Sequence, residues 1–453
     1  MNRFSKVCDG ADWFLPGVSQ IIAAELREPA RFHRKQWEFA MIFRALSKLG
    51  VFGSQAVGLS MGGGRERLLY SIVHHVRQLV VTDLYDTETP WSCARTDNPE
   101  DFIKSDPPFP APLSRMTVLG ADMRDLPFPS ETFDFCYSTC AIEHIGGRGD
   151  FLRHLNEVHR VLRNGGVYVF STEFHYGPET IADPDNVIFS WDYLKDLLSS
   201  APLVPEPVFD ARLTRHTVNY PLPGNIRELS FAPGQFAYEA LHDFLPHLQL
   251  LRGKYPFTAG LFVLKKNPAL GGRPVPDIMG LEDSLGFLRH GVGEYRKSLR
   301  KGRVTVSPFS SLPGGIPPHF SDHAEFFTPA GVPDRTVFHT DYIWWGEGAR
   351  TFRISVEPLE GTAAVNARIH AYRTLDSEKV SCISERTVRC AGPTTIEFEI
   401  NVKDDYCYAL VGKAAEGECR LKHVSIESAS EGATEVRTDP PVLSASRELK
   451  AES

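Results

Sequence analysis

The chain has 453 residues, of which 42% are hydrophobic and 23% are charged, a composition typical of folded globular proteins. Its formal net charge of -8 argues against sequence-independent binding of nucleic acid, which needs a concentrated basic surface. No apolar run approaches the ~18 residues that cross a bilayer, and Asp9 and Asp12 interrupt the stretch where a signal peptide needs an apolar core. We therefore expect a cytoplasmic protein of two or three domains, with no nucleic-acid partner and no membrane span.

The 8 cysteines are spread thinly along the chain and form no C-x-x-C pair. This spacing predicts neither a zinc site nor a disulfide scaffold, and we expect no bound metal. A disulfide within the late group stays open, and that group consists of Cys382, Cys390, Cys407 and Cys419. In a reducing compartment these residues are expected to be small buried side chains.

Strands and helices alternate through the first half of the chain. A helix with apolar residues at helical spacing ends at Gly50, and a short apolar strand follows at Gln55–Leu59. Three consecutive glycines, Gly62–Gly64, separate this strand from a second helix, and the next strand runs to Asp83. After a proline-rich stretch the alternation resumes, with strands expected near 116–120, 133–139 and 167–174 and a helix at 151–162. Such alternation predicts a parallel sheet with helices on its faces.

The composition and the hydrophobic pattern change in the second half of the chain. Residues from about 175 to 245 are rich in proline and aromatic residues and are expected to form a lid, before two strands near 247–266 complete the sheet. Residues 268–335 are expected to be a linker and a helix. From 336 to 430 the hydrophobic period becomes two, which predicts an antiparallel β-sandwich, and residues 431–453 are expected to be a disordered tail.

The three glycines stand between the first strand and the following helix. Glycine is retained where the backbone takes a positive φ or where another group comes very close. The dinucleotide fingerprint G-x-G-x-x-G and the Walker motif are both absent, which weakens the phosphate-binding interpretations. Asp83 ends the second strand about 20 residues further on, where an acid commonly binds ribose hydroxyls in such folds. A tight turn without a ligand and a simple turn acid are the competing interpretations.

Two later stretches carry a family resemblance. They are "GADMRDLPFPSETFDFCYSTCAIEHIGG", residues 120–147, and "LNEVHRVLRNGGVYVFS", residues 155–171. Together with the glycine loop and Asp83, their order and spacing resemble class I S-adenosylmethionine-dependent methyltransferases. The resemblance covers roughly Trp37 to Lys266, so residues 37–267 are expected to form the methyltransferase domain and residues 1–36 an N-terminal segment preceding it.

The resemblance implies S-adenosylmethionine as the cofactor and assigns its binding residues. Ser60, Gly62 and Gly64 match the loop that cradles the methionine part, and Asp83 matches the ribose acid. Four further residues match the surroundings of the adenine, with Asp122 accepting from its exocyclic amine: Leu84, Ala121, Asp122 and Met123. Ser138 ends the fourth strand, where contacts to the methionine part and the acceptor are expected.

Two positions depart from the family pattern. Gly58 and Ser60 stand where the family loop usually has an acidic residue and a glycine. Gly58 has no side chain with which to hold the amino group of the cofactor, and Glu66 could partly compensate. A catalytically degenerate domain, serving as a scaffold for a glycan- or protein-binding β-domain, is therefore the alternative function.

Three residues are candidate catalytic groups. Glu143 and His144 follow the fourth strand, on the side where the acceptor is expected, and His175 lies just past the fifth strand. A hydroxyl acceptor benefits from a base whose pKa is near neutral, which suits histidine. Packing roles for these side chains are the competing interpretation.

These observations together predict an α/β fold: a Rossmann-like, seven-stranded, mostly parallel sheet followed by an antiparallel β-sandwich domain. The expected function is transfer of a methyl group from S-adenosylmethionine to an oxygen atom of a small-molecule or saccharide (glycan) acceptor. The link from the β-sandwich to a glycan is an analogy of fold.

Overall fold

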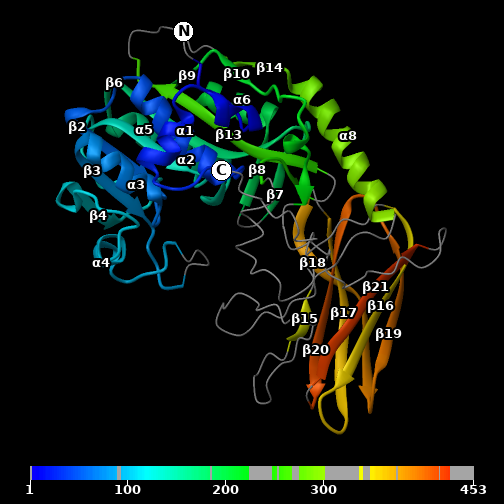
Figure 1. Ribbon diagram of the computed structural model, residues 1–453. Coiled ribbons are helices and arrows are strands. Elements are labelled where there is room, and N and C mark those ends of the chain that lie inside the picture. Colours follow the sequence, from blue (N-terminus) through cyan, green and yellow to red (C-terminus); the bar gives the residue numbers. More distant parts are fainter. Residues whose placement is uncertain are drawn as a thin grey trace, which may run out of the picture. The chain divides into compact units, whose positions relative to one another are not determined.

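Five parallel strands form the centre of the first sheet in the computed structural model of the chain (Figure 1). Their pairing places them in the order β4, β3, β2, β5 and β6. Strand β13 then pairs with β6 in the antiparallel direction. The bounds are β2 Gly53–Met61, β3 Val76–Asp83, β4 Met116–Gly120, β5 Phe133–Thr139, β6 Leu162–His175 and β13 Tyr255–Lys265.

The structure describes residues 3–88, 93–183, 186–223, 247–252, 255–267, 275–300, 336–339, 347–373, 376–417 and 419–428. Several expectations therefore lie outside the described residues. These are the last part of the lid, from 224 to 245, much of the linker, at 268–274 and 301–335, and the tail at 431–453. No helix in the described ranges is long and apolar enough to cross a membrane.

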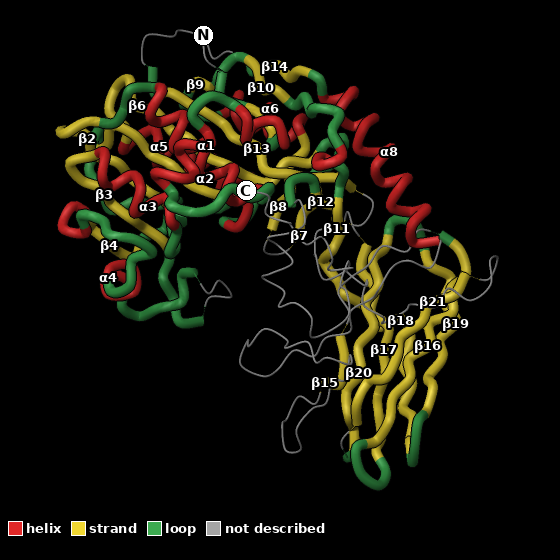
Figure 2. The backbone as a smooth tube through the Cα atoms, in the orientation of Figure 1, coloured by secondary structure: helices red, strands yellow, loops and turns green. Residues whose placement is uncertain are grey.

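Helices cover both faces of the sheet. Successive residues of a strand point to opposite sides, so each face carries apolar side chains that a helix can bury. On β3, Leu79 and Val81 belong to one hydrophobic core and Val80 to the other. The first core includes side chains of α2 (Arg34–Lys48) and α3 (Arg67–Ile72), and the second includes those of α5 (Arg148–Val161) and α6 (Trp191–Ser200). Figure 2 shows these helices around the strands.

Short strands and further helices complete this part of the chain. The short strands are β1 Lys6–Val7, β7 Ile181–Asp183, β8 Asn186–Ser190, β9 Val204–Pro205, β10 Val208–Asp210, β11 Leu222–Pro223, β12 Leu250–Arg252 and β14 Asp277–Met279. The remaining helices are α1 Val18–Gln20, α4 Pro99–Lys104 and α8 Leu281–Arg300. Both β1 and β9 pair with β13, so several short strands rather than one seventh strand continue the sheet beyond β13.

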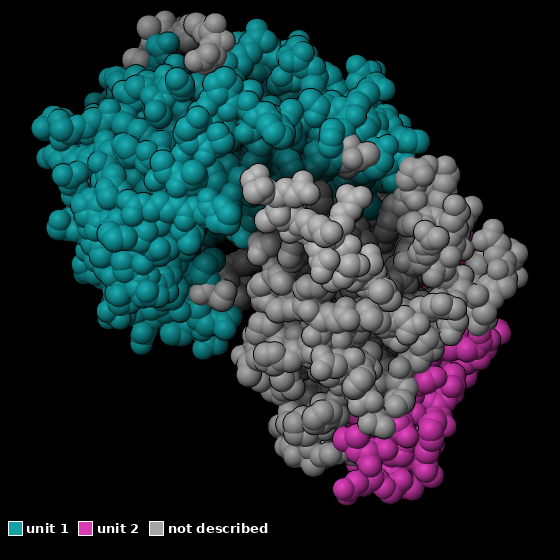
Figure 3. Space-filling view, viewed as in Figure 1, with its two compact units in different colours: residues 1–222, 243–292, 375–378 teal, residues 223–242, 293–374, 379–453 magenta. Residues whose placement is uncertain are grey.

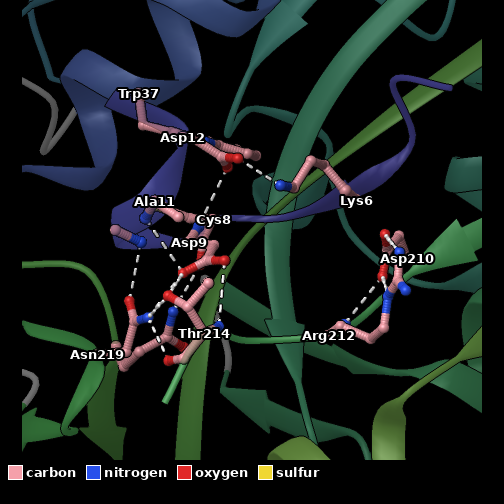
Figure 4. Close-up of polar contacts among 12 residues, drawn as sticks. Lys6, Cys8, Asp9, Ala11, Asp12, Trp37, Asp210, Arg212, Thr214 and Asn219 are labelled. Atoms are coloured by element: carbon pink, nitrogen blue, oxygen red, sulfur yellow. Dashed lines mark hydrogen bonds and ion pairs between the residues drawn. The ribbon is translucent and has the colours of Figure 1, made fainter. Parts of the chain in front are cut away.

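The N-terminal residues are part of this sheet instead of preceding it. Lys6 pairs with Leu261 of β13, and polar contacts fix the segment that follows (Figure 4). Asp9 accepts hydrogen bonds from the Thr214 hydroxyl and the Asn219 amide, each at 2.7 Å. Asp12 accepts from the indole of Trp37 at 2.7 Å and pairs with Lys6. These contacts anchor the first turn of α2, which carries site residues.

Contacts between Cα atoms divide the chain into two units (Figure 3). Unit 1 comprises residues 1–222, 243–292 and 375–378, and unit 2 comprises residues 223–242, 293–374 and 379–453. The described strands of the C-terminal region are β15 Thr336–His339, β16 Gly348–Pro358, β17 Ala363–Arg373, β18 Asp376–Cys390, β19 Thr394–Val402, β20 Tyr406–Glu416 and β21 Cys419–Ser428.

Two antiparallel sheets share a core in the C-terminal region. One sheet has the order β19–β16–β21, and in the other β20 pairs with β15 and β17. Their apolar faces meet, because Phe352 of β16, Phe398 of β19, Ile369 of β17 and Leu410 of β20 lie in one buried cluster. The predicted fold class is confirmed: a mostly parallel, Rossmann-like sheet is followed by an antiparallel β-sandwich.

Candidate functional site

The glycine loop after β2 is tightly packed. Gly62 and Gly64 have φ values of +61° and +43°, a region that side chains disfavour. A Cβ on Gly63 would lie 2.5 Å from the Ser60 hydroxyl oxygen, and one on Gly62 would lie 2.5 Å from the Cβ of Ala141. Each of the three positions therefore requires glycine, because of a positive φ or because a side chain would not fit. The loop also approaches the segment that follows β5.

Asp83 joins this loop to the end of β3. Its carboxylate accepts hydrogen bonds from the backbone amides of Gly64, at 2.8 Å, and Leu84, at 2.7 Å. Burial raises the pKa of Asp83 above its ordinary value, although both amides oppose this. The Ala121 amide donates to the Asp83 carbonyl at 2.9 Å, and the Leu84 side chain is 64% exposed beside it. The structure thus brings Gly64, Asp83, Leu84 and Ala121 together.

Asp122 follows Ala121 and is held by an arginine. Arg124 donates from Nε and Nη2 to both carboxylate oxygens at 2.7–3.0 Å. These hydrogen bonds lower the pKa of Asp122, so it is a carboxylate at neutral pH. It is one-third exposed, which leaves lone pairs for a further donor.

A buried hydrogen-bond chain, the His154 relay, connects Met123 to Ser138. His154 Nδ1 lies 3.0 Å from the Met123 carbonyl, His154 Nε2 lies 2.8 Å from the Tyr168 hydroxyl, and that hydroxyl lies 2.7 Å from Ser138 Oγ. Since a carbonyl only accepts, Nδ1 carries the proton and Tyr168 donates to Nε2. Burial lowers the pKa of His154 to about 4, so the ring is neutral. The Ser138 hydroxyl is therefore held by Tyr168, on the side of His154 and α5.

Two of the candidate catalytic residues lie past the end of β5. Glu143 is buried in the short helix η5 (Ile142–His144), and the Thr172 hydroxyl donates to its Oε2 at 2.9 Å. Its Oε1 has no partner among the described residues. Burial raises the pKa of Glu143, and His144 partly opposes the shift. Glu143 and His144 are thus adjacent to each other and to β6.

His175 is separate from this pair. It lies four residues beyond Ser171 on β6, about 13 Å along an extended strand. Its Nδ1 lies 2.7 Å from the Glu179 carbonyl, and burial lowers its pKa to about 4. The structure therefore places a neutral, buried imidazole at the C-terminal end of β6.

Glu66 lies closer to the glycine loop than any of the three candidates. Its carboxyl contacts the Thr139 hydroxyl at the end of β5 and lies 4.0 Å from Lys35 Nζ. Burial raises the pKa of Glu66 to about 8, and Lys35 opposes this only in part. Glu66 is the N-cap residue of α3, two residues after Gly64, so it brings a carboxyl group to the end of the glycine loop.

One protein-family model matches part of the first unit. The model of a methyltransferase domain matches residues 59–170, which include the glycine loop, Asp83, Asp122 and η5. Residues 59–170 of the chain therefore belong to a methyltransferase domain. No curated protein sequence matches the chain.

Solved structures resemble the methyltransferase at low identity. A putative sarcosine dimethylglycine methyltransferase from Galdieria sulphuraria is 17% identical, with 56% of this chain and 91% of that chain covered and a TM-score of 0.33. The 1,6-didemethyltoxoflavin-N1-methyltransferase from Burkholderia thailandensis is 16% identical (coverage 49% and 74%, TM-score 0.30). A geranyl diphosphate methyltransferase in complex with SAM is 18% identical (coverage 58% and 96%, TM-score 0.32).

Two buried hydroxyl groups beside the glycine loop lack hydrogen-bond partners. Ser60 and Tyr137 pair across β2 and β5, and both hydroxyl oxygens are buried. The two hydroxyls interact, but the contact lacks hydrogen-bond geometry, and neither has a partner elsewhere in the described residues. Since buried polar groups are normally paired, these two hydroxyls leave unused hydrogen-bonding capacity beside the glycine loop.

Sequence reasoning missed the contribution of α2 to the methyltransferase site. Lys35 Nζ lies 3.5 Å from Glu38 Oε2 and 3.5 Å from the Thr139 carbonyl, and Arg34 pairs with Glu173 at 2.7 Å. Arg34 and Glu38 are one helical turn apart, so both face β6. The only sequence signal was a cluster of charges in a helix that is otherwise apolar on its buried side.

Packing explains why residue 58 is a glycine where the family pattern has an acidic residue. A Cβ there would lie 2.2 Å from Cζ of the buried Phe135 ring, so restoring the acid of the family pattern is not tolerated. We expect Gly58→Asp to lower the free energy of unfolding by about 1–3 kcal/mol, the typical cost of overpacking a core. Urea unfolding followed by circular dichroism measures this. Gly53→Asp is the matched control on β2, because a Cβ at Gly53 meets nothing within 4 Å. Equal losses in both variants would contradict the packing explanation.

Proposed function

We propose that this methyltransferase methylates a hydroxyl group of a small-molecule or saccharide acceptor. The observation that carries the proposal is Glu143: a buried carboxyl beside the end of β5, held through one oxygen by Thr172, with its other oxygen unpaired in the described structure. A carboxyl whose pKa is raised is a stronger base than an ordinary one, and it suits removal of a hydroxyl proton. Acceptors that need no base do not require such a group.

The residues around the glycine loop are proposed to hold the cofactor. Asp83 accepts from the ribose hydroxyls, Leu84 lies against the adenine, and Asp122 accepts from the adenine amine. Glu66 binds the ammonium of the methionine part, in place of the acid missing at Gly58. S-adenosylmethionine supplies a methyl group on a sulfonium, which is already a good leaving group. Positioning the acceptor oxygen and removing its proton are then the tasks of the protein.

Cofactor binding is expected to release a proton. With a pKa of about 8, Glu66 is mostly protonated at pH 7, but it must ionise to pair with an ammonium. The dissociation constant should therefore fall as pH rises from 6 to 8, by at most about tenfold per pH unit. Calorimetric titration with S-adenosylmethionine at pH 7, in two buffers of different ionisation enthalpy, measures the proton released. Glu66→Gln should bind more weakly, without proton release. Equal proton release by this variant and the native chain would exclude the role given to Glu66.

The activity itself is tested with a labelled methyl group. Purified protein is incubated with methyl-labelled S-adenosylmethionine and panels of hydroxyl, amine and carboxylate acceptors, and product formation is measured for each class. Label appearing only on hydroxyl acceptors supports the proposal. Label confined to amines or carboxylates overturns the choice of oxygen. Failure to bind the cofactor at all would favour the scaffold alternative.

A further inference from the structure

Lys35 lies in the first turn of α2, and its Nζ atom has three oxygen neighbours around the end of β5. Glu38 Oε2 and the Thr139 carbonyl oxygen are each 3.5 Å away, and Glu66 Oε1 is 4.0 Å away. Hydrogen bonds between charged groups are ~2.7–2.9 Å long, so all three contacts are weak ones for an ammonium group with three donors. The Lys35 ammonium therefore retains donors for a ligand.

Three other cations near the glycine loop have closer partners. Each has an oxygen atom at 2.7–3.0 Å in the described structure, and the three are Arg34, Arg65 and Arg67. Arg34 Nη1 lacks a partner among the described residues, but that atom is buried. The Lys35 side chain is 39% exposed, so a ligand can reach it from solvent. Lys35 thus combines long contacts with an accessible side chain.

Glu66 places an acidic group beside the Lys35 ammonium. It is the N-cap residue of α3, and its side chain is 14% exposed. In an α-amino acid the ammonium and the carboxylate are attached to one carbon atom, so the two charges lie side by side. A protein carboxylate and a protein ammonium 4.0 Å apart, such as Glu66 and Lys35, offer the complementary pair of charges. Each protein group can then pair with the opposite charge of the ligand.

Resting on the proposed cofactor site, we propose that Lys35 binds the carboxylate of the methionine part of S-adenosylmethionine while Glu66 binds its ammonium. The cofactor replaces the long Lys35–Glu66 contact with two shorter ion pairs. The positive end of the α2 helix dipole, where Lys35 lies, adds to the attraction for a carboxylate. The site therefore selects ligands that carry both charges of an amino acid, and the N-terminal part of the chain supplies a cofactor-binding residue.

The test compares S-adenosylmethionine with its decarboxylated form, which keeps the ammonium and the sulfonium but lacks the carboxylate. Calorimetric titration of the full native chain should show binding of the decarboxylated ligand weaker by at least about tenfold, since a hydrogen bond between charged groups is lost. Lys35→Gln should weaken binding of S-adenosylmethionine by a similar factor. It should also reduce the difference between the two ligands to less than about threefold, because the group that distinguishes them is gone.

Two further variants separate contact with the carboxylate from a structural role. Lys35→Arg keeps the positive charge and should preserve more of the preference for S-adenosylmethionine than Lys35→Gln does. Lys48→Gln, at the exposed C-terminal end of α2, is the matched control and should leave both dissociation constants unchanged. Circular dichroism of each variant verifies that the chain is folded.

The outcomes distinguish this inference from the proposed function. If the folded native chain binds neither ligand, the proposed function is overturned and the inference falls with it. If the native chain binds both ligands equally well, the role of Lys35 alone is overturned and the cofactor site stands. If Lys35→Gln weakens both ligands by the same factor and keeps the native preference, the inference is also overturned, because another group then binds the carboxylate.

Discussion

Replacing Asp83 by alanine is expected to weaken binding of S-adenosylmethionine at least about 100-fold. Two ribose hydroxyls would each lose a hydrogen bond to a carboxylate, and such bonds contribute roughly 1.5–3 kcal/mol each. The same carboxylate also accepts from the amides of Gly64 and Leu84, so its removal loosens the glycine loop as well. Calorimetric titration of the native chain and the variant measures the change.

Two further variants show where this loss originates. Asp86→Ala removes an exposed carboxylate three residues further along and should leave the affinity unchanged. Asp83→Asn keeps an acceptor for one amide and loses the charge, so its affinity should lie between those of the native chain and the alanine variant. If Asp83→Ala binds the cofactor within a factor of three of the native chain, the ribose assignment is wrong.

Replacing Glu143 by glutamine is expected to lower kcat by about 10²–10⁴, the usual contribution of a general base. The amide keeps the shape of the side chain and its contact with Thr172, but it cannot take a proton. Affinity for S-adenosylmethionine should change less than twofold, because Glu143 lies beyond the cofactor loop. Single-turnover methyl transfer to a hydroxyl acceptor measures the chemical step directly.

The pH profile distinguishes catalysis by Glu143 from a structural role. Burial raises the pKa of Glu143, and a base acts only when it is deprotonated. Native kcat should therefore increase with pH through that raised pKa, and the residual rate of Glu143→Gln should not follow it. Glu100→Gln, on exposed α4, is the control for loss of one carboxylate and should keep the native profile. An unaltered pH profile in Glu143→Gln would remove Glu143 from the proton transfer.

Local patterns in the sequence predicted most of the sheet. Alternating apolar residues in β16 and β19 predicted strands with one buried face, and Phe352, Ile354, Ile396 and Phe398 do lie in a shared core. The glycine triplet and the acid ending β3 predicted a loop and a carboxylate meeting at one edge, because consecutive parallel strands end together. These signals are local, since each depends on residues adjacent in the chain or on a period of two.

Other parts of the site depend on contacts between distant segments. Arg34, Lys35 and Glu38 reach the ends of β5 and β6 across more than 100 residues of sequence, and no local pattern fixes which strand a helix covers. The strand Lys6–Val7 has only two residues, too few to show the alternation of apolar and polar residues that predicts a strand. Ser138 was expected at the cofactor, but the direction of its hydroxyl is set by Tyr168 and His154, which only the fold brings together.

The His154 relay has a consequence for acid tolerance. His154 and His175 are both buried with pKa values of about 4, whereas an unfolded chain binds these protons near pH 6.5. Between those values the unfolded chain holds protons that the folded chain excludes, so the free energy of unfolding must decrease as pH falls from 6.5 toward 4. Urea titrations at pH 7 and pH 5 measure this slope, and His154→Gln should make it shallower. The hydrogen-bond chain that joins Met123, His154 and Tyr168 thus also makes the methyltransferase domain sensitive to mild acid.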